Sequence, residues 1–244
     1  MTTENRLLGK LNGEIQDKLA PNLKLVSLEL GTMLHDAGDT IEDVYFPIDC
    51  LLSITISMSD GATAEVGMVG NREMLGVNSF MGINAITQTN YNVQIAGKAV
   101  KVNARLLREE FDRNKNVRDV LLGYTQALIA QTSQTAACNR LHPLEKRLAR
   151  WLLEAQDRVD SNELKLTQEF IADMLGVRRA GVTQAAQKLQ ESGLIVYRRG
   201  NVQILDKPKL EAASCECFLC LKDEYDRLLG TKNRGDLQNR SHLL

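Results

Sequence analysis

The residues best suited to bind a charged ligand are basic side chains gathered between Gly176 and Gln203. This stretch contains five basic residues and a single acid, Glu191, in a chain whose formal net charge is −1. The basic residues are Arg178, Arg179, Lys188, Arg198 and Arg199. Because phosphate contacts supply most of the salt-dependent affinity for nucleic acids, this local excess of positive charge predicts a nucleic-acid interface.

Two short helices joined by a glycine turn must position these side chains. Thr167 can cap a helix from Gln168 to about Leu175, and Gly176 supplies the left-handed residue that ends it. A second helix starts two residues later and stops at Gly193. Two further runs, 194–197 and 202–205, then predict a hairpin. This order is typical of a helix-turn-helix followed by a wing.

The amino-terminal end of the second helix is the part that would approach base edges in the major groove. Arginine can bind guanine and glutamine can bind adenine, each through two hydrogen bonds. Arg198 and Arg199 belong to the wing, where phosphate contacts are the expected role. The predicted DNA-contacting residues are Thr167, Gln168, Arg178, Arg179, Gly181, Thr183, Gln184, Lys188, Arg198 and Arg199.

The first hundred residues have the alternation of β-strands. Apolar and polar residues alternate over 52–58, and Asp60-Gly61 can close a hairpin onto a second run, 62–69. Further alternation follows at 91–95 and 99–102. Many short strands of this kind favour a closed or sandwiched antiparallel sheet.

A long helix is predicted from about Val117 to Leu141, and Pro143 separates it from a further helix over 144–159. Within the long helix, one row of residues has heptad spacing: Leu121, Tyr124, Leu128, Gln131, Thr135 and Cys138. We interpret this row as a seam between two copies of the chain, which makes the protein a homodimer. The alternative is that the helix packs on its own domain.

A β-rich domain, a long helix and a winged helix in this order resemble the family of the cyclic-AMP receptor protein and the fumarate–nitrate regulator, the Crp/Fnr transcription regulators. The most specific pieces are Leu164–Ile195 and the segment Arg140–Leu153 that precedes it. The resemblance implies an α+β fold with a jelly-roll sensor, homodimers on a two-fold operator in double-stranded DNA, and contact with RNA polymerase. The expected parts are a sensor (1–115), a dimerisation helix (116–142), a DNA-binding domain (143–214) and a cysteine-containing tail (215–244).

Two departures from the family pattern affect specificity. Family members that bind cyclic nucleotides hold the phosphate with an arginine, but no arginine occurs between Arg72 and Arg105 here. Tight binding of cyclic AMP is therefore not expected, because the phosphate loses a bidentate partner. The remaining candidates for an effector pocket are Arg72, Glu73, Thr132 and Ser133. In the recognition helix, Ala180 replaces the family's glutamate and cannot accept a hydrogen bond from cytosine, so a different operator is expected.

The tail contains three closely spaced cysteines, Cys215, Cys217 and Cys220. A tetrahedral metal site needs a fourth ligand, and the other thiols are Cys50 and Cys138. The spacing leaves two interpretations open, incidental cysteines and a metal or redox switch. No cofactor is predicted, and the family's amino-terminal iron–sulfur ligands are missing because no cysteine precedes Cys50.

Two other classes of protein remain as alternatives. A cupin-like metalloenzyme would need clustered histidines, whereas the three histidines are His35, His142 and His242. A signalling adaptor could use its winged helix to bind protein, but the basic cluster disfavours it. We therefore expect a protein without enzymatic activity. The lack of a long apolar run or secretion signal, and the odd cysteine count, favour the cytoplasm.

Overall fold

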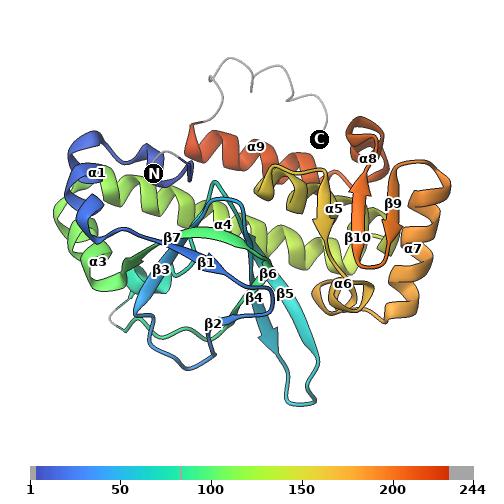
Figure 1. Cartoon of the computed structure of the whole chain (residues 1–244), viewed down its shortest axis with the longest axis horizontal. Coiled ribbons are helices and arrows are strands. Elements are labelled where there is room, and N and C mark those ends of the chain that lie inside the picture. The colour runs from blue at the N-terminus through green and yellow to red at the C-terminus, as the bar shows by residue number, and fades with distance from the viewer. Residues whose placement is uncertain (1–3, 83, 231–244) are drawn as a thin grey trace.

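The computed structural model describes residues 4–82 and 84–230, which form an amino-terminal β-roll, a long connecting helix and a carboxy-terminal winged helix (Figure 1). All strand pairs are antiparallel. The predicted α+β class, with strands first and a helix-turn-helix last, is confirmed.

The β-roll consists of two sheets whose strand orders are β1-β7-β3 and β2-β6-β4-β5. The expected hairpin is present as β4 and β5, and Gly61 in its turn has φ +86°. The sequence patterns did not predict β1, β2 or β3. The strands are β1 (Lys24–Leu28), β2 (Met33–His35), β3 (Asp43–Pro47), β4 (Leu51–Ser57), β5 (Thr63–Val69), β6 (Asn90–Ile95) and β7 (Gly97–Asn103).

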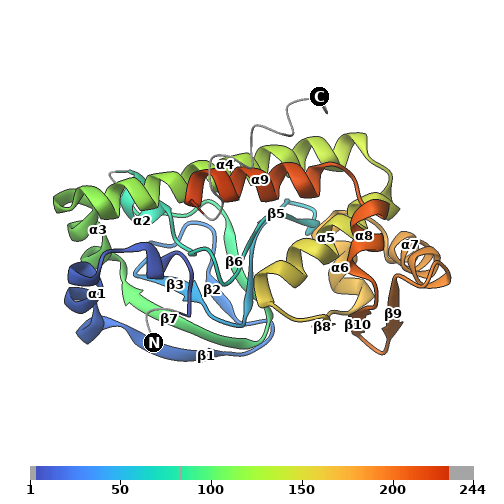
Figure 2. The same ribbon diagram turned by 90° about the horizontal axis from the view of Figure 1, so that it is seen from above.

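Short helices flank the roll. They are η1 (Leu8–Lys10), α1 (Gly13–Leu19), η2 (Ala20–Asn22), α2 (Asn78–Met81) and α3 (Ala104–Arg113). Figure 2 shows α1 and α3 at the end of the roll that lies away from the winged helix.

Strand β4 is buried on both faces over Leu51–Thr55, although its alternation predicts a half-buried strand. One face lies in the β-roll core, with Leu52 and Ile54. The other face is covered by the winged helix: Leu51 belongs to the core of that domain, and the Ser53 hydroxyl lies 3.7 Å from Met174 Sδ. Polar residues of β4 are therefore buried because a second domain packs on them.

The long helix α4 (Lys115–Leu141) and the following α5 (Leu144–Val159) are separated at Pro143, as predicted. Pro143 is the amino-terminal cap of α5 and has extended backbone angles, φ −65° and ψ 152°. Twelve of the sixteen residues of α5 are buried, because this helix lies between the β-roll and the helices of the winged domain. Among the helices of residues 4–82 and 84–230, not even α4 has the apolar stretch that a membrane span requires.

The interpretation of the heptad row as a partner-facing seam is wrong. Leu121, Tyr124 and Leu128 belong to the core of the β-roll within the same chain, and the Tyr124 hydroxyl donates to the Met74 carbonyl at 2.7 Å. Gln131 and Cys138 are also buried inside the chain. Tertiary packing, which heptad spacing alone does not reveal, uses this face of α4 for the protein's own core.

The tail forms helix α9 (Cys217–Leu229), which packs along α4 (Figure 2). This helix contacts both domains. Phe218 lies in the core of the winged helix, whereas Tyr225 and Leu229 lie in the core of the β-roll. The remaining tail, 231–244, is outside the described residues.

A buried carboxylate joins the β-roll to α5. Glu65 accepts hydrogen bonds from the Trp151 indole at 2.8 Å, the Ser53 hydroxyl at 2.8 Å and the Gln94 amide at 2.5 Å. Burial nevertheless raises the pKa of Glu65 from 4.5 to about 7, because desolvation outweighs these hydrogen bonds. The buried residue Trp151 is thus also a polar contact between the domains.

We expect Glu65 to make folding stability fall as pH rises from about 4.5 to about 7. In this window the native protein keeps a proton that the unfolded chain has lost, so each pH step favours unfolding. The full loss is about 3 kcal/mol and persists above pH 7. Urea unfolding of the wild type and Glu65→Gln across this range should show the wild type losing stability relative to the variant. If the free energies of unfolding of the two proteins changed in parallel with pH, the raised pKa of Glu65 would be contradicted.

Candidate nucleic-acid interface

Local capping signals form the helix-turn-helix. The Thr167 hydroxyl accepts a hydrogen bond from the Phe170 amide at the start of α6 (Gln168–Leu175). Gly176 ends this helix with φ +61°, a conformation that favours glycine. The second helix, α7 (Arg179–Glu191), begins after Arg178, whose side chain makes no capping hydrogen bond. The predicted helices and turn are confirmed.

The two helices bury their apolar faces against α5. Ile171, Leu175, Val182, Ala186 and Leu189 belong to one core with the apolar residues of α5. The Thr183 hydroxyl donates to Gln168 Oε1 at 2.8 Å, which sets α7 relative to α6. The opposite side of α7 is left facing outward.

The wing is the sheet β8-β10-β9, made of β8 (Glu163–Lys165), β9 (Ile195–Arg198) and β10 (Asn201–Ile204), and α8 (Lys207–Ala213) follows it. Arg199 and Gly200 form the two-residue turn, with φ +49° and φ +78°. Two positive φ values are typical of a type I′ hairpin turn, in which a residue other than glycine is uncommon. The turn therefore places the Arg199 side chain at the tip of the wing.

The predicted DNA-contacting residues of α7 lie at its exposed amino-terminal end. Arg178, Arg179, Thr183 and Gln184 are exposed. Arg179 lies 3.6 Å from Glu169 of α6 in an exposed ion pair. Within residues 4–82 and 84–230, the side chains of Arg178, Gln184, Arg198 and Arg199 make no hydrogen bond or ion pair with the protein.

Gln168, Thr183 and Lys188 also have partners within the protein. Thr183 and Gln168 bond to each other, as described above. Lys188 forms an ion pair with Glu145 of α5. A Cβ at Gly181 would lie 3.0 Å from Leu144, so the small size of this residue serves helix packing rather than approach to a ligand.

A hollow of about 390 Å³ separates the start of α7 from the wing. Its lining residues are Thr167, Gln168, Arg179, Tyr197, Arg199 and Gly200. Burial raises the pKa of Tyr197, whose hydroxyl donates to the Leu166 carbonyl at 3.0 Å. The hollow is thus bordered by two arginines and a neutral tyrosine.

The four candidates for an effector pocket do not line a common cavity in the described part of the chain. The Arg72 guanidinium lies 5.0 Å from the centre of the Tyr225 ring, and Glu73 is paired with Arg158. Thr132 and Ser133 are exposed on α4, and each hydroxyl donates to a carbonyl one turn earlier in the helix. A cavity of about 530 Å³ lies elsewhere, between the β-roll and the winged helix, bordered by Thr55, Asn92, Phe170 and Arg199.

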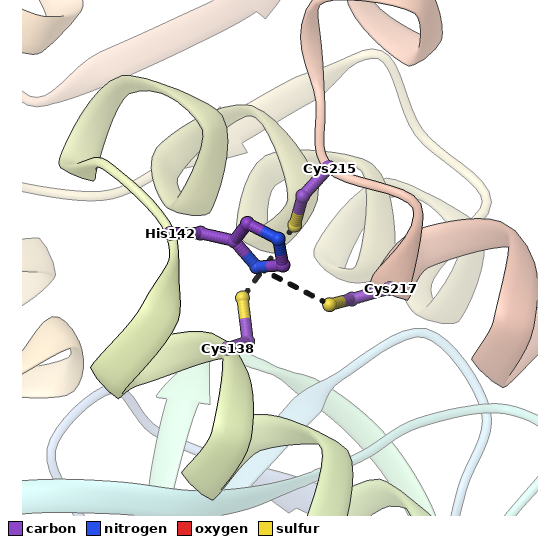
Figure 3. Close-up of side chains that lie close together, drawn as sticks. All are labelled: Cys138, His142, Cys215 and Cys217. Carbon is purple, nitrogen blue, oxygen red and sulfur yellow. Dashed lines mark hydrogen bonds between the residues drawn. The ribbon is translucent and has the colours of Figure 1, made fainter.

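The candidate metal ligands are only partly those expected. Cys215 and Cys217 lie beside Cys138 and His142 from the end of α4, as Figure 3 shows, whereas Cys220 is exposed and outside this group. Cys138 lies in the last turn of α4 and His142 directly follows this helix, and their four-residue spacing was a usable signal for such a pair. The tail supplies two of the four potential ligands, and the other two come from a segment more than seventy residues earlier.

The β-roll, the long helix and the winged helix with a basic outer face together make a Crp-like fold. Residues 146–213 match the model of the Crp-like helix-turn-helix domain, within the predicted DNA-binding part. With the solved structures below, this match confirms the predicted resemblance to the Crp/Fnr family.

Solved structures share this fold over most of their length. A protein from Eubacterium rectale assigned to the Crp/Fnr family has a TM-score of 0.65 at 21% identity, covering 86% of this chain and 98% of that one. FixK2 from Bradyrhizobium japonicum has a TM-score of 0.68 at 15% identity, covering 79% and 98%. The c-di-GMP responsive regulator CLP from Xanthomonas campestris has a TM-score of 0.65 at 14% identity, covering 80% and 100%. No relative is found among curated proteins.

Proposed function

We propose that the protein is a sequence-specific DNA-binding transcription regulator that acts as a homodimer. The observation that carries the proposal is the exposed amino-terminal end of α7, where Arg178, Arg179 and Gln184 face outward beside the arginines of the wing. Arginine and glutamine at this position of a helix-turn-helix can read guanine and adenine. Arg198 and Arg199 would hold the phosphates on either side.

The dimer would form through a different face of α4 from the one predicted. Leu122 and Ile129 are 45% and 58% exposed, and Ala136 continues their seven-residue spacing. Gln126 and Ser133 lie between them at heptad positions. A second copy packed along this exposed row would bury apolar side chains that water otherwise covers.

We expect Ile129→Lys to shift the protein from dimer to monomer, because two lysines would face each other across a twofold interface. Sedimentation velocity over a concentration series measures the shift. Leu141→Lys is a matched control, since Leu141 is 75% exposed and lies off this row. A wild type that stays monomeric, or an equal response of both variants, would refute the interface.

Regulation would act through the joint at Pro143. Because α5 starts there and carries the winged helix, a small rotation of α5 against α4 would change the separation of the two recognition helices in a dimer. The effector would bias this rotation by binding one arrangement more tightly than the other. The expected partners are a two-fold operator and RNA polymerase in the cytoplasm.

Selection of binding sites from a random duplex library tests the proposal without knowledge of the operator. We expect enrichment of a two-fold symmetric sequence by the full-length protein. A variant with Arg178 and Arg179 both replaced by alanine should lose the enrichment. Equal enrichment by this variant and the wild type, or none by the wild type, would overturn the proposed function.

A further inference from the structure

Four potential metal ligands converge where the sensor meets the winged helix. Cys138 and His142 lie on one face at the end of α4, and Cys215 and Cys217 lie at the start of α9 (Figure 3). Their ligand atoms all lie within 4.8 Å of one another. The Cys138 and Cys215 sulfurs are 3.5 Å apart, as are the Cys217 sulfur and His142 Nδ1.

These distances match a single tetrahedral ion. Zinc–sulfur bonds of about 2.3 Å at tetrahedral angles separate two sulfur ligands by about 3.8 Å. Three cysteines and one histidine are a common ligand set for structural zinc. An iron–sulfur cluster would need its ligands spread around several atoms, so a mononuclear ion fits this compact group better.

The surroundings orient the ligands and balance their charge. His142 Nε2 lies 3.1 Å from a carboxylate oxygen of Glu216, which leaves Nδ1 directed at the sulfurs. Such a carboxylate partner is usual behind a metal-bound histidine. The Gln134 amide donates to the Cys217 sulfur at 3.0 Å. The cationic side chains of Arg147 and Arg150 lie close enough to Cys138 and Cys215 to interact with them electrostatically.

Ordinary core packing does not account for this group. The three cysteines form a buried cluster of their own, separate from the cores of the two domains. His142 and Glu216 are polar residues at its edge. Small hydrophobic residues would fill such a space without a histidine and its carboxylate partner.

We propose that Cys138, His142, Cys215 and Cys217 bind one Zn²⁺ ion that joins the two ends of the DNA-binding domain. Two of the ligands immediately precede this domain and two immediately follow it, so a single ion links the two segments that flank residues 143–214. The ion would hold the α4–α5 joint beside Pro143 in one arrangement. Binding replaces the three thiol protons, which are released to solvent. The expected effect of Zn²⁺ on DNA binding rests on the proposed function, whereas the binding of Zn²⁺ does not.

Metal content and cobalt spectroscopy test the site directly. Full-length protein, purified under anaerobic reducing conditions and stripped of metal, is titrated with Zn²⁺ and separately with Co²⁺. We expect one equivalent of Zn²⁺ per chain, with a dissociation constant on the order of 10 nM or tighter. Co²⁺ should give the intense visible bands of a tetrahedral ion and a thiolate charge-transfer band.

Matched variants assign the ligands. Cys217→Ser and His142→Gln should each abolish stoichiometric binding, whereas Cys220→Ser should bind as the wild type does. Glu216→Gln should weaken binding on the order of 10–100-fold, because it orients His142 without touching the ion. Circular dichroism of each variant establishes that it is folded, and His142→Gln, at the edge of the cluster, leaves the buried cysteines in place.

Several results would overturn the proposal. They are less than half an equivalent of Zn²⁺ bound, an octahedral cobalt spectrum, iron with acid-labile sulfide, or a Cys138–Cys215 disulfide in the anaerobic protein. Removal of Zn²⁺ should also weaken operator binding at least tenfold and increase hydrogen exchange around residues 139–146. If Zn²⁺ binds but its removal changes neither operator affinity nor hydrogen exchange, the ion does not hold the α4–α5 joint in one arrangement. Failure of DNA binding with the metal bound would instead count against the proposed function alone.

Discussion

Replacement of Arg179 by alanine should weaken operator binding by about 1–3 kcal/mol for each half-site. The guanidinium lies at the exposed first turn of α7, where its only ion pair with residues 4–82 and 84–230 is a solvent-exposed contact with Glu169. Such an exposed pair contributes little to the stability of the protein, so the Arg179 side chain can leave it and contact a base instead. Two distant half-sites should contribute additively in a dimer. Fluorescence anisotropy with the selected operator and with operators altered at single positions measures both affinity and specificity.

The expected signature is a loss of preference at one base pair in each half-site, in addition to weaker binding. Lys188→Ala should lower affinity for all sequences alike and reduce the slope of the salt dependence by about one, as a phosphate contact would. Arg105→Ala, in an exposed pair on α3, is the control and should leave binding unchanged. Weaker binding without any change in base preference would show that Arg179 contacts only the sugar–phosphate backbone of the DNA.

Replacement of Arg158 by methionine should destabilise the protein by about 3–5 kcal/mol. Arg158 is buried in α5 and binds both carboxylate oxygens of Glu73 in the β-roll, at 2.9 and 3.0 Å. Its guanidinium also lies 5.8 Å from the centre of the Tyr225 ring of α9. Removal of the cation takes the closer of two guanidinium partners from the buried Glu73 carboxylate, whose other ion pair, with Arg72, is 4.0 Å long. Urea unfolding should show the loss, together with separate transitions for the two domains.

A second substitution distinguishes this charge effect from a cavity. Glu73→Gln keeps an acceptor for the Gly70 amide, which donates to Glu73 at 2.6 Å, but removes the buried charge. The double variant Arg158→Met/Glu73→Gln should therefore recover much of the stability that Arg158→Met alone loses. Arg227→Met, which breaks an exposed pair with Glu224, should cost less than about 1 kcal/mol. Absence of recovery in the double variant would indicate that packing, not charge, dominates at this site.

The helix-turn-helix was predictable because its signals are local. Thr167 caps α6, Gly176 ends it with a left-handed conformation, and each can be identified from its immediate neighbours. The β4–β5 hairpin was predictable for the same reason, from alternation and Asp60-Gly61. The positions of the arginines on the exposed end of α7 then followed from the helix boundaries.

Contacts between distant segments could not be predicted in this way. The heptad row of α4 has the correct period, but the sequence does not state whether the chain's own core or a second copy covers it. Glu65 looks like an exposed residue of a hairpin until α5 packs on that face. The cysteine–histidine cluster unites residues 75–77 positions apart, so its completeness depends on the return of the tail to the end of α4.

Hydroxyl-radical footprinting on the selected operator tests the central claim most directly. We expect two protected windows on one side of the duplex, with centres about one helical turn, or a whole number of turns, apart. Guanines at the centre of each window should lose protection of N7, on the major-groove edge, from methylation when Arg179 is replaced. Uniform weak protection along the duplex, or a single window not related to a second one by the two-fold symmetry of the sequence, would contradict binding by two recognition helices.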